Sequence, residues 1–499
     1  MKSKYLPYLM LTGIIVLGFL FRLRGISADH SFWADESYIA SISRDIAQGK
    51  TAITDLFSIV GASYQPLQVI VMSVSFFIFG VSEWAARIPS VIFGTVGIFL
   101  AYLVGKNFSN KAGGLLSAFL YSFAELNLAY ATQARSYAAL TAIILAIVYC
   151  LQLLSQKNLQ RKKQILLHVG VVVLSFVAWL FHIVASLFFV IYGGFIIIHY
   201  RKSLFSFAKK HLIWTALGIL GILLFVYVSQ AYQHLLNLNS SKVNNVTYLR
   251  ELFARQYLFL VLPALFGLLL SYKKYIGAVF GIGLWGMALL FLWTFFKPSH
   301  NIRYILPLFP VLYVFFGVFW ARAGEKMFNK QSGLICGIIA LILLTGGYKI
   351  SRKPAVYYSP NADLYADVQN ANYKDAFAFI EKKYPNYQDM IIFNDIIDAQ
   401  RWYLTEKPNA DAYFAKHANP PRPHVVNNVM EYGTLKDFLK EQSKHEKGLL
   451  IVEDWESILP EDIKQYAKKN MKLEYRVESL EVSPTDKWPI EIYSWGMEE

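Results

Sequence analysis

Two adjacent carboxylates, Asp35 and Glu36, follow Trp33 shortly after the first hydrophobic segment of the chain. A carboxylate held in place can take a proton from a hydroxyl group, so an acid here is a candidate general base. The alternative is structural, because Asp35 could cap a helix whose first apolar position is Ile39. Capping alone would not explain the preceding Trp33 or the second polar loop at 64–67. The pair therefore predicts catalytic chemistry on a helix start, which can hold a carboxylate rigidly.

Two arginines lie at the ends of later hydrophobic segments. Arg135 belongs to the run 133–137, and Arg303 belongs to the run 297–304. An arginine close to hydrocarbon is costly unless it is paired, reaches the interface or meets a ligand. Snorkelling beside aromatic residues needs no ligand, whereas two arginines converging from separate loops suit a doubly ionised phosphate. Both interpretations stay open for this group, which comprises Gln133, Arg135, Tyr137, His300, Arg303 and Tyr304.

Three further polar residues are candidates of second rank. Gln65 lies in a polar loop before a short apolar run, and His182 lies at a tight turn between two apolar segments. A lone histidine at such a turn is more often a satisfied interface residue, although ionisable groups among membrane helices are functional candidates by default. Arg87 could simply anchor the helix that follows it and pair with Glu83.

The composition places these residues in a membrane protein. Of the 499 residues, 55% are hydrophobic and only 16% are charged, and the mean hydropathy is +0.37, which is too apolar for a soluble protein of this length. The net charge of +14 could suggest nucleic acid, but Lys and Arg fall mainly in short loops between apolar runs, which argues against that partner. Cys150 and Cys336 lie inside apolar runs and indicate neither a disulfide nor a metal site. The first apolar run lacks a cleavage site before Arg22 and is expected to be a retained anchor.

About eleven apolar runs are long enough to span a membrane as helices. They lie at about 5–23, 88–106, 112–125, 137–156, 164–181, 183–199, 212–230, 254–271, 275–296, 304–321 and 332–349. A further run at 66–80 is short and contains several polar residues. If this run spanned the membrane, the basic loops between the later helices would lie outside.

We assign the run 66–80 to the membrane interface, because the basic loops then all lie in the cytoplasm, as the positive-inside rule prefers. The protein is then expected in the cytoplasmic (inner) membrane. The polar loops that hold Asp35, Gln65, Arg135, His182 and Arg303 share the external face under this assignment, together with the C-terminal tail.

The composition turns polar after about residue 350. Strands are expected at 390–393, 448–452 and 490–493, and amphipathic helices at 373–383, 435–444 and 460–469. The expected domains are therefore a membrane domain at 1–350, with an external loop at 24–65, and an extracytoplasmic α/β domain at 351–499. No nucleotide-binding, zinc-protease or serine-hydrolase motif is present in the sequence.

In family order, the motifs resemble those of the GT-C membrane glycosyltransferases, in particular the bacterial family 39 and ArnT-like group related to protein O-mannosyltransferases. The resemblance covers roughly residues 5–350, and its motifs are Trp33-Ala34-Asp35-Glu36, Gln65-Pro66-Leu67, Ala86-Arg87-Ile88-Pro89-Ser90, Gln133-Ala134-Arg135-Ser136-Tyr137 and Arg303-Tyr304-Ile305-Leu306-Pro307. One departure is Tyr64-Gln65-Pro66, where the ArnT branch has a Glu-Lys-Pro-type turn. This departure weakens the case for a bound metal and for an aminoarabinose donor, so a divalent cation stays open as a cofactor.

The resemblance implies transfer of a sugar from a polyprenyl-phosphate donor to an acceptor hydroxyl of a protein, lipid A or surface glycan, with inversion at the anomeric carbon. Asp35 would be the general base beside Glu36. Arg135 and Arg303, with Tyr137 and Tyr304, would bind the leaving phosphate. The residues left as substrate or metal candidates are Gln65, His182, Gln133 and His300.

Two other classes of protein remain as alternatives. A lipid-linked oligosaccharide polymerase or ligase also places arginines in external loops, but it typically carries a large loop between helices rather than a terminal domain. A transporter without chemistry usually has repeated halves and broken helices near the bilayer midplane. The ionisable groups of this chain gather instead at helix ends.

Overall fold

The chain divides by its contacts into two compact units that interleave along the sequence. A computed structural model describes residues 5–27, 31–59, 64–156, 158–210, 245–296, 302–327, 331–352, 354, 371–394, 397–415, 418–423, 429–453, 459–479 and 489–497. One unit comprises Met1–Gly25 and Ser90–Ala366, and the other comprises Ile26–Pro89 and Asp367–Glu499. This division differs from the expected order of domains, 1–350 followed by 351–499, because residues 26–89 pack with the C-terminal domain.

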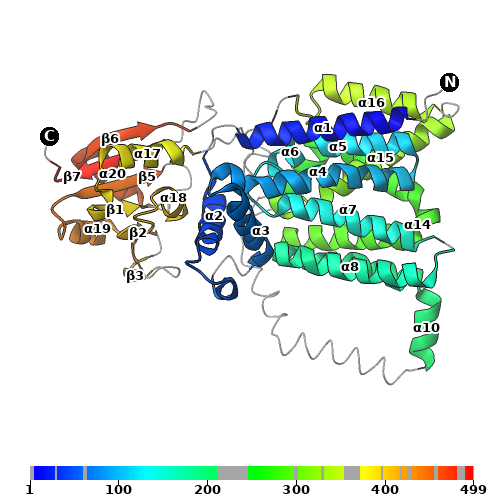
Figure 1. The fold of residues 1–499 in the computed structure, drawn as a ribbon, viewed down its shortest axis with the longest axis horizontal. Helices are drawn as coiled ribbons and strands as arrows, with labels where there is room; N and C mark the ends of the chain where they lie inside the picture. The colour runs from blue at the N-terminus through cyan, green and yellow to red at the C-terminus, as the bar shows by residue number, and fades with distance from the viewer. Residues whose placement is uncertain are drawn as a thin grey trace. The chain divides into compact units, whose positions relative to one another are not determined.

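The first unit consists of helices (Figure 1). They are α1 (Leu6–Ser27), α4 (Glu83–Phe108), α5 (Lys111–Phe123), α6 (Glu125–Tyr130), α7 (Tyr137–Leu154), α8 (Arg161–Phe181), η3 (Ile183–Leu187), α9 (Phe188–His199), α10 (Arg201–Lys210), α13 (Asn245–Leu249), η5 (Arg250–Gln256), α14 (Leu258–Phe296), η6 (Ile302–Tyr304), α15 (Leu308–Met327) and α16 (Ser332–Gly346), of which α1 and α4 cross the boundary between the units. Among the described residues, six of these helices are long and apolar enough to cross a membrane: α1, α4, α7, α8, α14 and α15. The run expected at 212–230 lies outside the described residues, and every other expected run coincides with a helix.

The helix α14 folds back on itself at Tyr275. The backbone there is not helical (φ −127°, ψ 41°), so two helical stretches meet at this residue. The chain just before the first stretch lies beside the end of the second, because the rings of Tyr248 and Trp293 are 5.1 Å apart. α14 therefore supplies both of the helices expected at 254–271 and 275–296.

Two glycines let the halves of α14 approach their neighbours closely. A Cβ atom on Gly267 would lie 2.0 Å from the carbonyl oxygen of Phe315 in α15, and one on Gly281 would lie 2.3 Å from that of Ile191 in α9. Small residues at such crossings allow backbone-to-backbone packing, which replaces the hydrophobic effect as a source of helix association in lipid.

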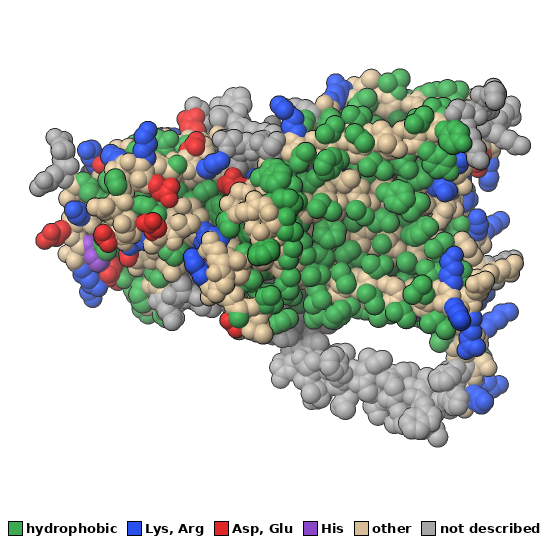
Figure 2. Space-filling model, viewed as in Figure 1, with side chains coloured by type: hydrophobic (Ala, Val, Ile, Leu, Met, Phe, Trp, Pro, Cys, Tyr) green, Lys and Arg blue, Asp and Glu red, His purple; other side chains and the backbone are tan. Residues whose placement is uncertain are grey.

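The basic ends of several helices meet at one end of the helical unit. The guanidinium group of Arg322 in α15 donates to the carbonyl oxygens of Phe108 and Leu270 at 2.6 and 2.8 Å. The hydroxyl group of Tyr275 donates to the carbonyl oxygen of Asn107 at 2.8 Å, which adds the turn of α14 to the same end. Figure 2 shows a largely hydrophobic surface along the helices, with Lys and Arg side chains gathered at this end. The basic loops thus lie at one end, as the positive-inside assignment requires, and the side of the membrane that this end faces stays a prediction.

The second unit contains a mixed seven-stranded sheet. Its strands are β1 (Ile391–Asn394), β2 (Ala412–Phe414), β3 (Arg422–Pro423), β4 (Met430–Tyr432), β5 (Gly448–Glu453), β6 (Lys472–Val477) and β7 (Ile490–Trp495), in the order β3-β4-β2-β1-β5-β7-β6. The four central strands β4, β2, β1 and β5 pair in parallel, and the outer strands pair antiparallel. The helices of this unit are α2 (Ala34–Ala47), η1 (Ile53–Phe57), α3 (Pro66–Phe79), α17 (Tyr373–Lys383), η7 (Tyr387–Asp389), α18 (Ile397–Tyr403), α19 (Leu435–Gln442) and α20 (Glu461–Asn470).

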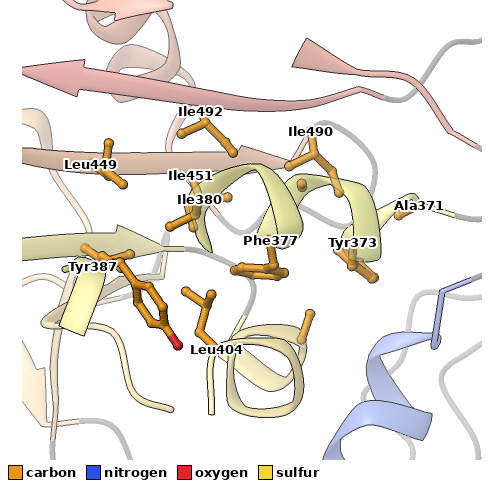
Figure 3. Packing of buried hydrophobic residues seen from close by; sticks show 13 residues of the cluster. Ala371, Tyr373, Phe377, Ile380, Tyr387, Leu404, Leu449, Ile451, Ile490 and Ile492 are labelled. Atoms are coloured by element: carbon orange, nitrogen blue, oxygen red, sulfur yellow. The ribbon is translucent and has the colours of Figure 1, made fainter. Parts of the chain in front are cut away.

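Two hydrophobic cores hold this sheet between helices. Figure 3 shows the first core, in which Ile380 of α17 lies beside Ile451 of the sheet and Phe377 lies on the side of α17 toward Leu404. The second core contains Phe438 of α19, together with residues of α20 and the sheet. The three strands and three helices expected after residue 350 are therefore confirmed within a few residues. The strands β2, β3, β4 and β6 and the helix α18 were not expected.

The apolar run expected in the membrane interface forms α3. This helix begins with Pro66 at its first turn and ends before Gly80, whose φ of 81° an L side chain rarely adopts. Its 14 residues reach about 21 Å at 1.5 Å per residue, which is less than the roughly 30 Å of a hydrocarbon core. The length supports the interfacial assignment.

Candidate functional site

The acid pair lies in the first turn of α2, and the two carboxylates have different roles there. Trp33 is the N-cap residue, with extended backbone (φ −66°, ψ 151°), so Asp35 does not occupy the capping position. The carboxylate of Glu36 instead accepts the backbone N–H of Trp33 at 3.0 Å, as in one half of a capping box. Asp35 is only partly buried, whereas Glu36 is 2% exposed.

Arg87 of α4 binds the buried Glu36. Its Nε donates to Glu36 Oε1 at 3.2 Å, and its Nη2 lies 3.4 Å from both Glu36 Oε2 and the carbonyl oxygen of Ser31. The guanidinium carbon stands 4.8 Å from the centre of the Phe32 ring. Arg87 is 1% exposed, so the pair is fully enclosed. Sequence reasoning expected Arg87 to pair with Glu83; in the structure Arg87 forms an ion pair with Glu36 and interacts electrostatically with Glu83.

The C-terminal domain fastens the chain just before Asp35. The hydroxyl group of Tyr403 accepts the backbone N–H of Phe32 at 2.8 Å and donates to the carboxylate of Glu83. The Ser31 hydroxyl donates to the carbonyl oxygen of Ala371 at 2.5 Å. The rings of Phe32 and Trp402 lie 5.0 Å apart. Residues far apart in the sequence therefore fix the backbone from which Asp35 projects.

A third carboxylate, Asp398, belongs to the same region. It lies in the first turn of α18. Burial and, to a smaller extent, the negative charge of Asp35 raise the pKa of Asp398 to about 7, against the opposing effect of Arg401. Sequence reasoning missed Asp398, because it follows Asp35 by several hundred residues and carries no motif. Its signal was the short amphipathic segment 397–403, which precedes a polar loop.

Arg135 stands in the turn before α7 in the helical unit. Its backbone carbonyl accepts the hydroxyl of Ser90 at 3.0 Å, and its N–H donates to the carbonyl of Gln133 at 2.8 Å. Its guanidinium carbon lies 5.6 Å from the centre of the Tyr137 ring. Tyr137 also packs on Tyr130, with ring centres 5.2 Å apart. Arg135 is 8% exposed, so this side chain is held among aromatic rings rather than extended into solvent.

His182 lies beside the same aromatic group. Its ring centre is 6.0 Å from that of Tyr137. Its Nδ1 accepts the backbone N–H of Val184 at 3.2 Å, which caps η3. The structural role weighed for His182 is therefore present, and its ring is at the same time a neighbour of the Arg135 turn.

Arg303 and Tyr304 form η6, just before α15. Arg303 Nη2 lies 3.4 Å from the Tyr304 hydroxyl, and its guanidinium carbon lies 5.2 Å from the centre of that ring. His300, the other candidate of this loop, lies outside the described residues.

The two arginines stand at the same end of the helical unit. Tyr121 of α5 connects the early turns of α7 and α15, because its hydroxyl is 2.8 Å from that of Thr141 and within electrostatic range of Tyr313. α7 and α15 therefore begin side by side, with Arg135 and Arg303 just before them. This end is opposite the basic end of α15. Direct convergence of the two guanidinium groups stays a prediction.

The remaining candidates are buried. Gln65 is the N-cap residue of α3, is 8% exposed, and its Oε1 has no hydrogen-bond partner among the described atoms. Gln133 is 9% exposed. The described residues contain no group of three or more His, Cys, Asp or Glu side chains that could hold a metal ion. Asp35 and Asp398 offer two carboxylates, the type of ligand that a divalent cation prefers, so a bound cation stays a prediction.

The comparisons with known proteins agree on a membrane glycosyltransferase fold. Residues 65–229 match the family model of the dolichyl-phosphate-mannose-protein mannosyltransferases, while no curated protein matches the chain in sequence. ArnT from Cupriavidus metallidurans in the apo state is similar with a TM-score of 0.60 at 12% identity, over 97% of each chain. The same protein bound to undecaprenyl phosphate gives 0.54 at 13% identity, again over 97% of each chain.

A more distant structure shares the same fold. The archaeal oligosaccharyltransferase AglB from Archaeoglobus fulgidus, in complex with an inhibitory peptide and a dolichol-phosphate, gives a TM-score of 0.52 at 12% identity. The similarity covers 82% of this chain and 64% of that one. The chain thus has the GT-C fold of the membrane glycosyltransferases, as the sequence resemblance predicted, and the segment that carries Gln65, Arg87, Arg135 and His182 matches the mannosyltransferase family.

Proposed function

We propose that this protein is an inverting glycosyltransferase that moves a sugar from a polyprenyl-phosphate donor to an acceptor hydroxyl on the external face of the inner membrane. The observation that carries the proposal is the setting of Asp35, a partly buried carboxylate on a helix start that Glu36, Arg87 and the C-terminal domain hold in place. Such a rigidly mounted carboxylate suits a general base.

The donor class is supported by the solved relatives. ArnT binds undecaprenyl phosphate and AglB binds dolichol-phosphate in structures that share this fold. The tail of such a donor stays in lipid while its phosphate reaches water, and Arg135 and Arg303 stand at helix starts where that boundary is expected. An arginine fork matches the geometry of a phosphate.

The proposed reaction is a single displacement. The acceptor oxygen attacks the anomeric carbon from the face opposite the phosphate, and its proton passes to the carboxylate of Asp35. The bond between the anomeric carbon and the phosphate oxygen breaks, and its electron pair stays on the phosphate. The charge that grows on this oxygen is stabilised by Arg135 and Arg303. Glu36 acts as a positioning residue, because its carboxylate is already bound by Arg87 and the Trp33 N–H.

The test measures release of polyprenyl phosphate from a panel of polyprenyl-phosphate sugars by the purified protein in lipid, with membrane extracts as acceptors. Asp35→Asn should lower release by about 10²–10⁴-fold, because it removes the base and keeps the shape. Arg303→Ala should lower it by about 10²–10³-fold, because it removes a donor to the leaving phosphate.

The matched control is Asp55→Asn, an exposed acid of η1 in the same external segment, which should leave release unchanged. Release that does not depend on Asp35 would contradict its role as the base. No release from any donor by folded protein would favour the ligase or transporter alternatives.

A further inference from the structure

A polar pocket of about 400 Å³ lies between α2 and α18, within the second unit. We call it the α2–α18 pocket. It is lined by Tyr38, Arg44, Asp45, Lys50, Thr51, Asp398, Arg401, Thr405, Pro408 and Asn409. Its volume lies in the range of pockets that bind small ligands. None of these residues was a candidate from the sequence.

One end of the pocket adjoins the proposed base. Tyr38 follows Asp35 by one helical turn, so the two side chains lie on the same face of α2. Asp398 interacts electrostatically with both Asp35 and Tyr38. Asp398 lines the pocket, so a molecule there can present a hydroxyl group to its carboxylate and to the face of α2 that carries Asp35.

The other end of the pocket is basic. Arg401 lies one turn after Asp398 on α18 and donates to Asp45 at 2.7 Å. Asp45 stands near the end of α2, about 15 Å along the helix axis from Asp35. Lys50 follows the helix, is exposed, and forms no ion pair with any residue in the described ranges. The pocket thus extends from Asp398, which interacts with Asp35, to the solvent-exposed ammonium group of Lys50 beyond the end of α2.

Arg44 shapes this basic end rather than serving as a ligand. Its guanidinium group donates to the carbonyl oxygens of Trp402 and Arg401 at 3.1 and 2.9 Å, and the residue is 6% exposed. It therefore ties the end of α2 to α18. Lys50 is left as the cation that a ligand can reach without breaking an existing contact.

The pocket also carries neutral hydrogen-bonding groups. The hydroxyl groups of Thr51 and Thr405 and the side-chain amide of Asn409 line it, with the ring of Tyr38 and the ring of Pro408 as apolar surfaces. Hydroxyl and amide groups can both donate and accept, which matches the alternating requirements of sugar hydroxyls. A lipid chain or an apolar peptide side chain would find few partners on such a lining.

We propose that the α2–α18 pocket is the acceptor subsite of this enzyme and takes an acidic glycan, with its acceptor hydroxyl toward Asp35 and a carboxylate or phosphate group toward Lys50. The proposal rests on the proposed glycosyl transfer and adds the chemical class of the acceptor. A glycan of more than one ring is required, because Asp35 and Asp45, near the two ends of α2, lie about 15 Å apart along the helix axis.

The binding test uses the full-length protein in lipid nanodiscs without donor. Calorimetry measures the Kd of a galacturonic acid trisaccharide and of the same trisaccharide with its carboxylates reduced to alcohols. The acidic form should bind at least about tenfold more tightly, as one charge-assisted hydrogen bond allows. Lys50→Gln should remove most of this difference. Lys469→Gln, an exposed lysine of α20, is the matched control and should keep the difference.

A second variant tests the neutral part of the pocket. Asn409→Ala should weaken binding of both trisaccharides to a similar extent, because the amide is expected to contact hydroxyl groups that both carry. Equal binding of the two trisaccharides, no binding of either, or an equal effect of Lys50→Gln and Lys469→Gln would overturn the proposal.

A transfer assay separates this proposal from the function on which it rests. Release of polyprenyl phosphate by the wild-type protein should rise several-fold when the acidic trisaccharide is added. Release that occurs with membrane extract but does not respond to a bound trisaccharide would overturn the acceptor subsite alone. Binding of the trisaccharide with no release from any donor would overturn the proposed function instead.

Discussion

At the scale of single residues, the Glu36–Arg87 pair is the most buried electrostatic contact of the site region. Arg87→Ala would leave the Glu36 carboxylate enclosed without its cation, and such losses cost about 3–5 kcal/mol. We expect a clear fall in the Tm of the protein in lipid nanodiscs. Lys444→Ala breaks an exposed pair with Glu441 and should cost only about 0.2–1 kcal/mol. Equal shifts for the two variants would show that the buried pair is not a structural anchor.

Asp398 gives the site region a pH dependence whose sign follows from its raised pKa of about 7. Between about pH 4 and pH 7, Asp398 stays protonated in the folded state, whereas in the unfolded chain its carboxyl group, with a pKa near 4, has lost its proton. The contribution of Asp398 to stability is therefore present at low pH and is lost as the pH rises from about 4 to about 7. The groups that set this behaviour are Asp35, Arg401 and Tyr38.

Asp398→Asn tests this linkage. The variant cannot ionise at this position, so its Tm should fall less than that of the wild type between pH 5 and pH 8. The measurement is a series of thermal unfolding curves in lipid nanodiscs across that range. Parallel curves for the two proteins would mean that Asp398 keeps an ordinary pKa.

At the scale of elements, the helix α18 holds the segment before Asp35 in place through its contacts, although it has only 7 residues. Tyr403→Phe removes the hydroxyl that accepts the Phe32 N–H and binds Glu83. Leaving these buried groups without their partner should cost about 1–3 kcal/mol and speed hydrogen exchange at the Phe32 amide. Tyr475→Phe is the control, because its hydroxyl forms no hydrogen bond within the described part of the chain. Unchanged exchange at Phe32 in the Tyr403 variant would contradict this role.

The elements also show why sequence reasoning succeeded in some places and failed in others. The membrane helices could be predicted from the apolar runs, because the thickness of the membrane sets the length of such runs. The helix α17 could be predicted from its apolar stripe, which includes Phe377 and Ile380. The strands β2 and β3 have 3 and 2 residues, too few to show an alternating pattern. The helix α18 has only 7 residues, and its residues Asp398 and Arg401 could not be linked to Asp35 without the fold.

At the scale of the whole molecule, segments that are neighbours in the sequence do not always belong to the same compact unit. Residues 26–89 were expected to belong with the membrane helices that surround them in sequence, but their contacts lie with residues 367–499. Local patterns cannot show this, because the decisive contacts, such as that of Phe32 with Tyr403, join residues separated by most of the chain. The candidate residues Asp35 and Glu36 were found from their types and motif, whereas the partners that fix them came only from the structure.

Because the second unit is built from two separate segments of the chain, it cannot be completed until both have been synthesised. Its first segment is made early, and its second follows after about tens of seconds of further synthesis at ordinary elongation rates. Glu36 and Arg87 can meet during this interval, because both belong to the early segment. The residues that contact Phe32 and Ser31 are not yet made, so the turn that holds Asp35 and Glu36 lacks these contacts during this interval. A chain that terminates before the second segment therefore contains Asp35 but lacks the contacts that hold the preceding backbone in place.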